Sequence, residues 1–368
     1  MIYLDNAATT MPKPDKVREA VAVALRLSGS AGRSSHKAAE YASQTVYECR
    51  DEVAEMFDCP MENVVFTFNA THGLNIAIKT LVQKGDRVLI SGFEHNAVLR
   101  PLYSVGAEIV TVGRKLFDQQ DTIAAFASSI DRNTKAVICT HMSNAFGYIL
   151  PVEEISQICK EYNVPLIVDA AQSAGVLPLS MRKLNAEYIA MPGHKGLFGP
   201  QGTGILLCKR SAEPLLEGGT GSSSKSLKMP EYLPDRLEAG TLNAHGIAGL
   251  LEGLRFVKGR TVNAIFAHEA EMISLLKGTL NSDMFQLFAS NEAQGGVLSL
   301  VPRFGCCEEI ASRLSRDGFA VRSGFHCSPL AHDSAGTYHT GTIRVSVSAF
   351  TKAEEIDKFC QYMNDLKY

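Results

Sequence analysis

A regular alternation of short β-rich runs with helical stretches is the feature that most constrains how this 368-residue chain can fold. Such alternation is typical of a mostly parallel sheet with helices on both faces, because each parallel strand needs a crossover to reach the next. The sequence therefore predicts an α/β fold. The strand-like runs are residues 63–68, 86–93, 107–112, 135–142, 165–170 and 202–208, and the helical stretches between them include 75–81, 121–130 and 152–162.

The flanking regions complete this division into segments. Apolar residues recur at steps of three and four between residues 36 and 57, which predicts a helix packed on a core. Glycine, serine and proline break the alternation at residues 218–241, which predicts a long surface loop. Beyond it we expect helices to about residue 280, strands at 295–301, 319–324 and 342–350, and helices at 307–316 and from Lys352 onward. We interpret residues 15–255 as a large domain and residues 1–14 and 256–368 as a smaller α+β domain.

Charge and cysteine content exclude several classes of function. A net charge of −3 offers no basic field for nucleic acid or anionic lipid, so we expect neither nucleic-acid nor membrane binding. The N-terminus has no basic stretch followed by an apolar core, which predicts a cytosolic, cytoplasmic protein. Nine cysteines without a C-x-x-C pair indicate neither a disulfide framework nor a zinc knuckle, and we expect no metal site.

Five of the nine cysteines lie in two different settings. Four of them lie in apolar runs or at inward helical positions and are expected to be small buried hydrophobes: Cys49, Cys139, Cys159 and Cys208. Cys327 differs, because Gly324, His326 and Pro329 surround it on an expected loop, where thiols are more often accessible. Its local sequence alone leaves open whether it is a metal ligand, half of a disulfide, a buried residue or a nucleophile.

Polar residues at the ends of the expected strands indicate a cofactor site, since ligands of open α/β sheets bind beyond the carboxyl ends of the strands. Pyridoxal phosphate (PLP) requires a lysine amine for its Schiff base, a carboxylate beside its pyridine nitrogen, a donor to its ring hydroxyl and an anion site for its phosphate. Lys195, Asp169, Gln172 and the turn at Thr71 supply these groups in turn, and His95 is placed to stack on the ring. The competing dinucleotide site is disfavoured, because no GxGxxG pattern follows a strand.

The chain resembles a known family, the cysteine desulfurases of fold type I, among the class V aminotransferase-like enzymes, and group II of that family in particular. The resemblance runs almost end to end. The motifs that carry it, in family order, are YLDNAATT at the start, EHNAVL, HMSNAFGYILPV, VDAAQSAG, GHKGLFGPQG, EAGTLN, RSGFHC and IRVSVSAF.

This resemblance implies the roles of the cofactor-binding residues. Lys195 is implied as the Schiff-base lysine, Asp169 as the partner of the pyridine nitrogen, Gln172 as the contact to the ring oxygen and His95 as the stacked imidazole. It further implies that the large domain binds PLP.

The resemblance also implies how the phosphate is held. Ala70, Thr71 and His194 are implied as phosphate-binding residues, joined by Thr241 from the other subunit of a homodimer. One family feature is missing, because Pro192 stands where a serine commonly binds the phosphate.

For the substrate, the resemblance implies that Asn144 and Arg344 receive the carboxylate of a cysteine or selenocysteine. Cys327 is implied as the nucleophile that takes sulfur as a persulfide while alanine is released. The short span from Cys327 to Arg344 resembles group II of the family, which includes the selenocysteine lyases, and a short loop makes a sulfur-acceptor protein plausible.

Two alternatives remain. An aminotransferase, epimerase or C–S lyase of the same superfamily would keep the cofactor, although transamination needs no thiol at Cys327. A metal-binding module built from His326, Cys327, His332 and His339 would leave Lys195 and Asp169 without a role.

Overall fold

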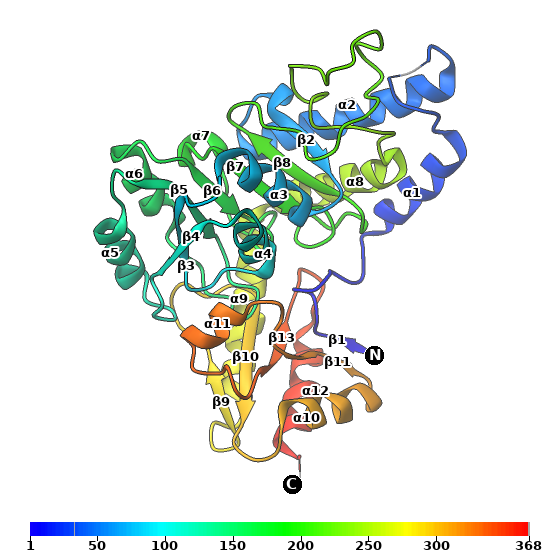
Figure 1. The fold of residues 1–368 in the computed structure, drawn as a ribbon. Coiled ribbons are helices and arrows are strands. Elements are labelled where there is room, and N and C mark those ends of the chain that lie inside the picture. Colours follow the sequence, from blue (N-terminus) through cyan, green and yellow to red (C-terminus); the bar gives the residue numbers. More distant parts are fainter. Residues whose placement is uncertain (33, 367–368) are drawn as a thin grey trace.

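A seven-stranded sheet forms the centre of the protein in the computed structural model, which describes residues 1–32 and 34–366 (Figure 1). The strand order is β2-β8-β7-β6-β5-β3-β4, and only β8 runs against its neighbours. The predicted α/β fold with a mostly parallel sheet is therefore confirmed. The strands are β2 (Val64–Thr67), β3 (Arg87–Ser91), β4 (Glu108–Val112), β5 (Thr134–Thr140), β6 (Leu166–Asp169), β7 (Tyr188–Pro192) and β8 (Gly204–Cys208).

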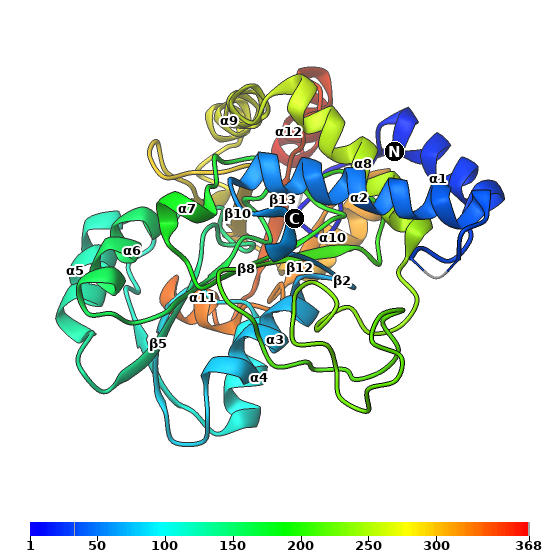
Figure 2. The ribbon, with the colours of Figure 1, turned by 90° about the horizontal axis from the view of Figure 1, so that it is seen from above.

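Helices cover both faces of this sheet, because successive residues of a strand point to opposite sides and both sides are apolar. In β5, Val137 and Cys139 join the apolar cluster under α2, α5, α6 and α8, whereas Ala136 and Ile138 join the cluster under α3 and α4. Figure 2 shows α2 and α8 on one side of the sheet and α3 and α4 on the other. The helices are α2 (Lys37–Phe57), α3 (Ala70–Leu81), α4 (Asn96–Val105), α5 (Gln119–Ser129), α6 (Val152–Glu161) and α8 (Ala244–Arg260), with α1 (Asp15–Leu27) packed on α8 and the short α7 (Met181–Leu184) beside α6.

A second, antiparallel sheet has the order β12-β13-β10-β9, and its core also contains side chains of α9, α10 and α12. Strand β1 (Ile2–Tyr3) pairs with β11 (Phe319–Ala320), so the start of the chain lies against the C-terminal region (Figure 1). The predicted domain boundary at residue 255 lies inside α8, and that division stays a prediction. These elements are β9 (Phe285–Phe288), β10 (Val297–Pro302), β12 (Arg322–Gly324), β13 (Thr342–Ser346), α9 (Val262–Thr279), α10 (Cys307–Arg316) and α12 (Ala353–Asn364).

Most predicted elements match the observed ones. The helix expected at residues 36–57 is α2, capped by His36, and the segment 218–241 holds neither helix nor strand. The single strand expected at residues 319–324 is wrong: β11 pairs with β1 and β12 pairs with β13, so two partners in different sheets divide it. Helices α1, α4 and the short α11 (Pro329–Ser334) were not predicted.

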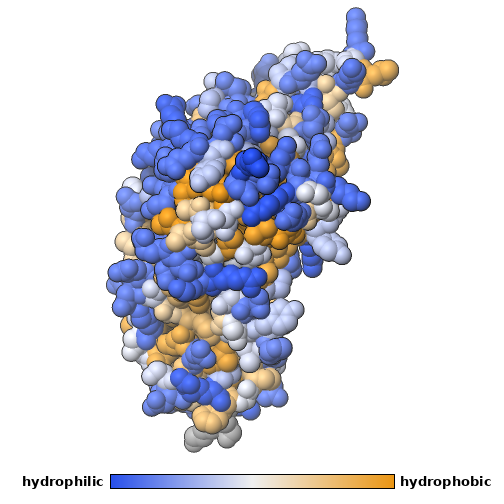
Figure 3. Space-filling view, turned by 60° about the vertical axis from the view of Figure 1, so that its left-hand side comes forward, coloured by the Kyte–Doolittle hydropathy of each residue, from blue (hydrophilic) through white to orange (hydrophobic). Residues whose placement is uncertain are grey.

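The surface is mixed in character. On the face shown in Figure 3, hydrophilic residues predominate, and hydrophobic residues gather near the middle of the view. Across the described parts of the chain, we find no helix with the length and apolarity that crossing a membrane requires.

Candidate active site

The predicted site residues meet at one edge of the central sheet. Parallel strands β3, β5, β6 and β7 all end there, so the residues that follow them come together although they are far apart in sequence. A cavity of about 90 Å³ at this edge is lined by eight of the residues predicted from sequence. They are Ala70, Thr71, His95, Asn144, Asp169, Gln172, His194 and Lys195.

Lys195 and Asp169 bring opposite charges into this cavity. Burial lowers the pKa of Lys195 to about 8, although the nearby carboxylate of Asp169 opposes that shift, and within the described residues its Nζ atom has no hydrogen-bond partner. Asp169 ends β6, is 2% exposed and accepts a 2.9 Å hydrogen bond from the N–H of Ala171. Burial raises the pKa of Asp169 as well. A carboxylate in this setting is stabilised by a cationic group placed beside it in the cavity.

The loop of Lys195 can approach the turn after Asp169 only because glycine flanks the lysine. A Cβ atom at Gly196 would collide with the carbonyl oxygen of Ala174, in the turn that follows Asp169. Glycine therefore allows the backbone of the lysine loop to approach the turn that follows Asp169.

His95 is neutral in this site. It is the N-terminal cap of α4, and its Nδ1 atom accepts a 3.0 Å hydrogen bond from the N–H of Ala97. Burial, followed by the charge of Lys195, lowers the pKa of His95 to about 4. Because Nδ1 is an acceptor, the proton of the neutral ring lies on Nε2.

The start of α3 supplies an anion site. Asn69 caps this helix by accepting a 2.9 Å hydrogen bond from the N–H of His72, and the first-turn N–H groups at Ala70 and Thr71 have no acceptor within the helix. Such a terminus favours a phosphate. Pro192 lines the same cavity and has no side-chain donor to offer it.

The N-terminal segment supports the lysine loop from outside the large sheet. The carbonyl oxygen of His194 accepts hydrogen bonds from Lys13 Nζ at 2.6 Å and from the N–H of Thr10 at 3.2 Å. Gln172 Nε2 donates to the carbonyl oxygen of Ala7 at 3.0 Å. Ala7 and Thr10 belong to the N-terminal motif YLDNAATT, whose residues had no predicted role.

Cys327 lies on a turn between β12 and α11, outside the cavity lining but held against its wall. Its carbonyl oxygen accepts a 2.8 Å hydrogen bond from the N–H of Asn96, next to His95. The carbonyl oxygen of His326 accepts a 2.7 Å hydrogen bond from Asn144 Nδ2. The Cys327 residue is exposed, as predicted. The four cysteines predicted to be buried, Cys49, Cys139, Cys159 and Cys208, are buried.

Arg344 is almost fully buried at 1% exposure and links three segments. Its Nη1 atom donates to the carbonyl oxygen of Asn144 at 3.0 Å, and its Nη2 atom forms a 2.6 Å ion pair with Asp5. Asp5 was not among the predicted site residues, although it lies within the N-terminal motif YLDNAATT. Thr241 is exposed and lines a separate hollow, so the structure does not bring it to the cavity of its own chain.

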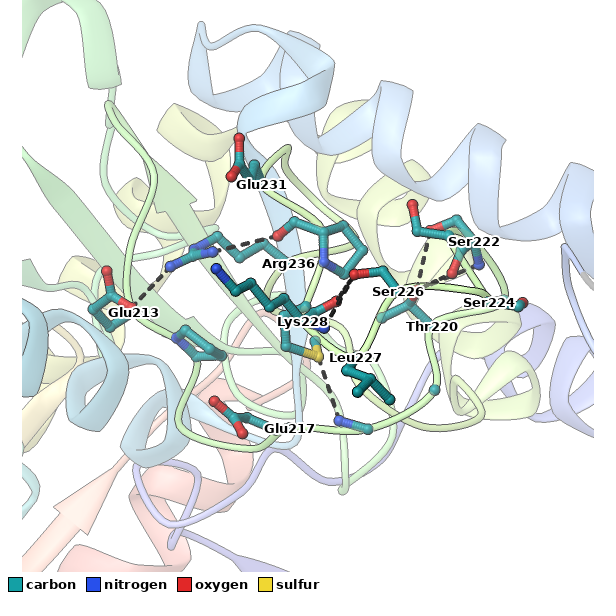
Figure 4. A pocket seen from close by; sticks show the side chains of 17 residues that line it. Glu213, Glu217, Thr220, Ser222, Ser224, Ser226, Leu227, Lys228, Glu231 and Arg236 are labelled. Carbon is teal, nitrogen blue, oxygen red and sulfur yellow. Dashed lines mark hydrogen bonds and ion pairs between the residues drawn. The ribbon is translucent and has the colours of Figure 1, made fainter.

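Another cavity, of about 670 Å³, lies elsewhere and is lined by none of the predicted site residues. Figure 4 shows that the loop between Glu213 and Arg236 encloses it and that these two residues form an ion pair, with an N–O distance of 2.8 Å. Apart from this pair, its wall carries mostly serine, glycine and solvated side chains.

The metal-binding alternative finds no support in the geometry. His326 Nε2 is 2.9 Å from Thr342 Oγ1, and His332 Nδ1 is 2.8 Å from Thr337 Oγ1. Over residues 1–32 and 34–366 there is no group of three or more His, Cys, Asp and Glu side chains arranged to hold a metal ion.

A mostly parallel sheet whose strand ends surround a lysine, a buried carboxylate, a neutral imidazole and a helix N-terminus defines a class of enzyme, and the comparisons identify it. The family model for class V aminotransferases matches residues 2–359, and the chain belongs to this family.

Within that family the chain is similar to proteins named as cysteine desulfurases. The chain is 30% identical, over 99% of its length and 94% of theirs, to a probable cysteine desulfurase of Methanothermobacter thermautotrophicus. It is also 30% identical to one of Pyrococcus abyssi, over 100% of this chain and 94% of the relative. The solved apo structure of a cysteine desulfurase from Thermococcus onnurineus superposes with a TM-score of 0.90 at 28% identity, covering 99% of this chain and 94% of that one. The resemblance inferred from the motifs is confirmed.

Proposed function

We propose that this protein is a PLP-dependent cysteine desulfurase that releases alanine from cysteine and receives the sulfur on Cys327. The observation that carries the proposal is the arrangement around one cavity. Lys195, Asp169 and His95 line it, and an exposed thiol sits on a turn bonded to Asn144 in its wall.

The residues present fit PLP. The amine of Lys195 has no competing hydrogen-bond partner among the described residues, and Asp169 is a buried carboxylate that a protonated pyridine nitrogen would stabilise. The start of α3 at Ala70 and Thr71, with His194, would hold the phosphate. His95 would lie on the ring as a neutral imidazole, and Gln172 has a second amide N–H to donate to the ring oxygen.

Bound PLP supplies an electron sink that makes the Cα proton of an attached amino acid acidic. The chain's own residues do the rest. With its pKa lowered to about 8, Lys195 Nζ can take up and return the Cα proton near neutral pH. Asn144 and Arg344 orient the substrate through its carboxylate, for which a guanidinium fork suits better than a point charge.

Cys327 performs the sulfur transfer. Its thiolate attacks the sulfur of the substrate, so that an S–S bond forms while the Cβ–S bond breaks. The electron pair of the broken bond remains on the organic fragment, which gains protons and leaves as alanine. The persulfide on Cys327 then passes its outer sulfur to a thiol.

An assay of alanine production from cysteine, with a reducing thiol present, tests the proposal. The purified protein should bind PLP and produce alanine and sulfide, and mass spectrometry should find one additional sulfur atom on the peptide of Cys327. Cys306 is the other exposed cysteine and offers the control. We expect Cys306→Ala to keep full activity and Cys327→Ala to lose it. Equal activity in the two variants contradicts the assignment.

We also propose a homodimer in which Thr241 reaches the phosphate site of the partner. Thr241 is exposed and shares a surface hollow with Phe68 and Leu216, whose exposed fractions are 56% and 47%. Large apolar side chains gathered around a hollow favour coverage by another protein surface. A second copy would cover them and bring Thr241 to a cavity that it does not reach in its own chain.

We also propose that a sulfur-acceptor protein binds beside Cys327. Phe325 and Tyr338 flank the Cys327 turn, are 45% and 50% exposed, and have ring centroids 5.6 Å apart. The turn is short and anchored, so an acceptor thiol has to approach the persulfide at this aromatic surface.

A further inference from the structure

The turn that carries Cys327 is strained. His326 has φ 50° and Cys327 has φ 59°, so two consecutive residues with side chains occupy the left-handed region. Such a conformation is unfavourable for a residue with a side chain, and it persists only where surrounding contacts offset its cost. The contacts that hold this turn therefore decide where the thiol stands.

The Asn144 side chain holds the turn at both ends of the strained pair. Its Nδ2 atom donates to the carbonyl oxygen of His326 at 2.7 Å, and its Oδ1 atom accepts from the hydroxyl of Ser328 at 2.5 Å. Both amide atoms are thus used, and Cys327 lies between the two anchoring points. The same amide is the one we propose for the substrate carboxylate, for which its second N–H remains.

Ser328 uses its hydroxyl in an unusual way. It stands at the N-cap position of α11, where a serine oxygen ordinarily accepts a hydrogen bond from the helix, but no such bond is present here. The residue is fully buried, and its hydroxyl donates to Asn144 instead. Instead of capping α11, the side chain contacts a residue that lies 184 positions away in sequence.

We propose that Ser328 is a positioning residue for the sulfur-transfer step: its hydroxyl, acting through Asn144, fixes the Cys327 turn beside the substrate site. This inference rests on the proposed function. The proposed role distinguishes two steps of the reaction, removal of the Cα proton and sulfur transfer. Removal of the Cα proton depends on Lys195 and on carboxylate binding, whereas only sulfur transfer depends on where the Cys327 thiol stands.

Ser328→Ala tests this separation, with Ser334→Ala as the matched control. Ser334 is on the same short helix, and its hydroxyl donates to the carbonyl oxygen of Gly92 at 2.9 Å, away from Asn144. We expect Ser328→Ala to lower kcat for cysteine desulfuration by about 10- to 100-fold, because small displacements of reacting groups have effects of that size. The exchange of the alanine Cα proton with solvent deuterium should change less than about threefold. Asn144→Ala should reduce both rates.

A second measurement uses the cofactor-free protein. Hydrogen–deuterium exchange in the segment 325–332 should quicken about tenfold in Ser328→Ala and at least as much in Asn144→Ala, which also removes the bond to His326. The double variant should exchange no faster than Asn144→Ala, since that substitution already removes the contact with Ser328. If wild type fails to desulfurate cysteine, the proposed function is wrong. The exchange result then still reports whether Ser328 and Asn144 hold the Cys327 turn. Unchanged exchange in Ser328→Ala, or an equal loss of desulfuration and Cα-proton exchange, would overturn the inference.

Discussion

Glu269 provides the sharpest physical prediction outside the reaction itself. This residue of α9 is 6% exposed, and its carboxyl group lines a cavity of about 30 Å³ together with Lys195 and Gln172. Within the described residues, its carboxyl group has no hydrogen-bond partner. Burial raises its pKa from 4.5 to about 8. The substitution Glu269→Gln preserves the shape and removes the ionisation.

The sign and size of the effect follow from that pKa. Between about pH 4.5 and pH 8, Glu269 keeps its proton in the folded chain and has released it in the unfolded chain. Because the unfolded state then binds fewer protons, the free energy of unfolding falls as the pH rises towards the pKa of the folded chain. At about 1.4 kcal/mol per pKa unit, wild type should lose about 3 kcal/mol between pH 5 and pH 8 that the Gln variant keeps. The loss levels off above pH 8.

The assay is urea or thermal unfolding of both cofactor-free chains at pH 5 and pH 8. Glu269→Gln should be clearly more stable than wild type at pH 8 and close to it at pH 5. Burial also raises the pKa of Glu94 to about 8, but that group is present in both chains and cancels in the difference. Glu271→Gln, an exposed position two residues along α9, controls for the general loss of one negative charge. A stability difference of equal size at both pH values would refute the reasoning.

Three further predictions concern the reaction. Lys195→Ala should abolish turnover, while absorbance titration with PLP should still show binding through the phosphate site and Asp169. With cysteine as substrate, Cys327→Ala should produce alanine well over ~10²-fold more slowly than wild type, a larger loss than removal of a positional contact would cause. With selenocysteine it should keep measurable alanine production, because the C–Se bond is weaker. Near-parental turnover of cysteine would favour the C–S lyase alternative. Mixing Lys195→Ala with Thr241→Ala chains should restore about a quarter of wild-type activity, since half of the randomly mixed dimers carry one intact site of two; no recovery despite proven subunit exchange would argue against the shared site.

The sequence by itself determined the sheet and most of the cavity. Apolar runs of strand length alternate with helical stretches, and this pattern allows few folds other than a parallel sheet with two covered faces. Once the strands are parallel, their carboxyl ends share one edge. The polar residues that follow them, such as His95, Asp169 and Lys195, must therefore meet there, wherever the loops run.

Only the tertiary structure decided how Arg344 and the Cys327 turn are held at the site. Asp5 pairs with Arg344, which lies 339 residues away, and Asn144 bonds to His326 and Ser328 across about half of the chain. No periodicity or local motif encodes such pairs, because they form where the N-terminal segment, the loop after β5 and the C-terminal region meet. The burial of Glu269 and the left-handed turn at Cys327 have the same origin: each is unfavourable locally and persists because contacts from distant segments surround it.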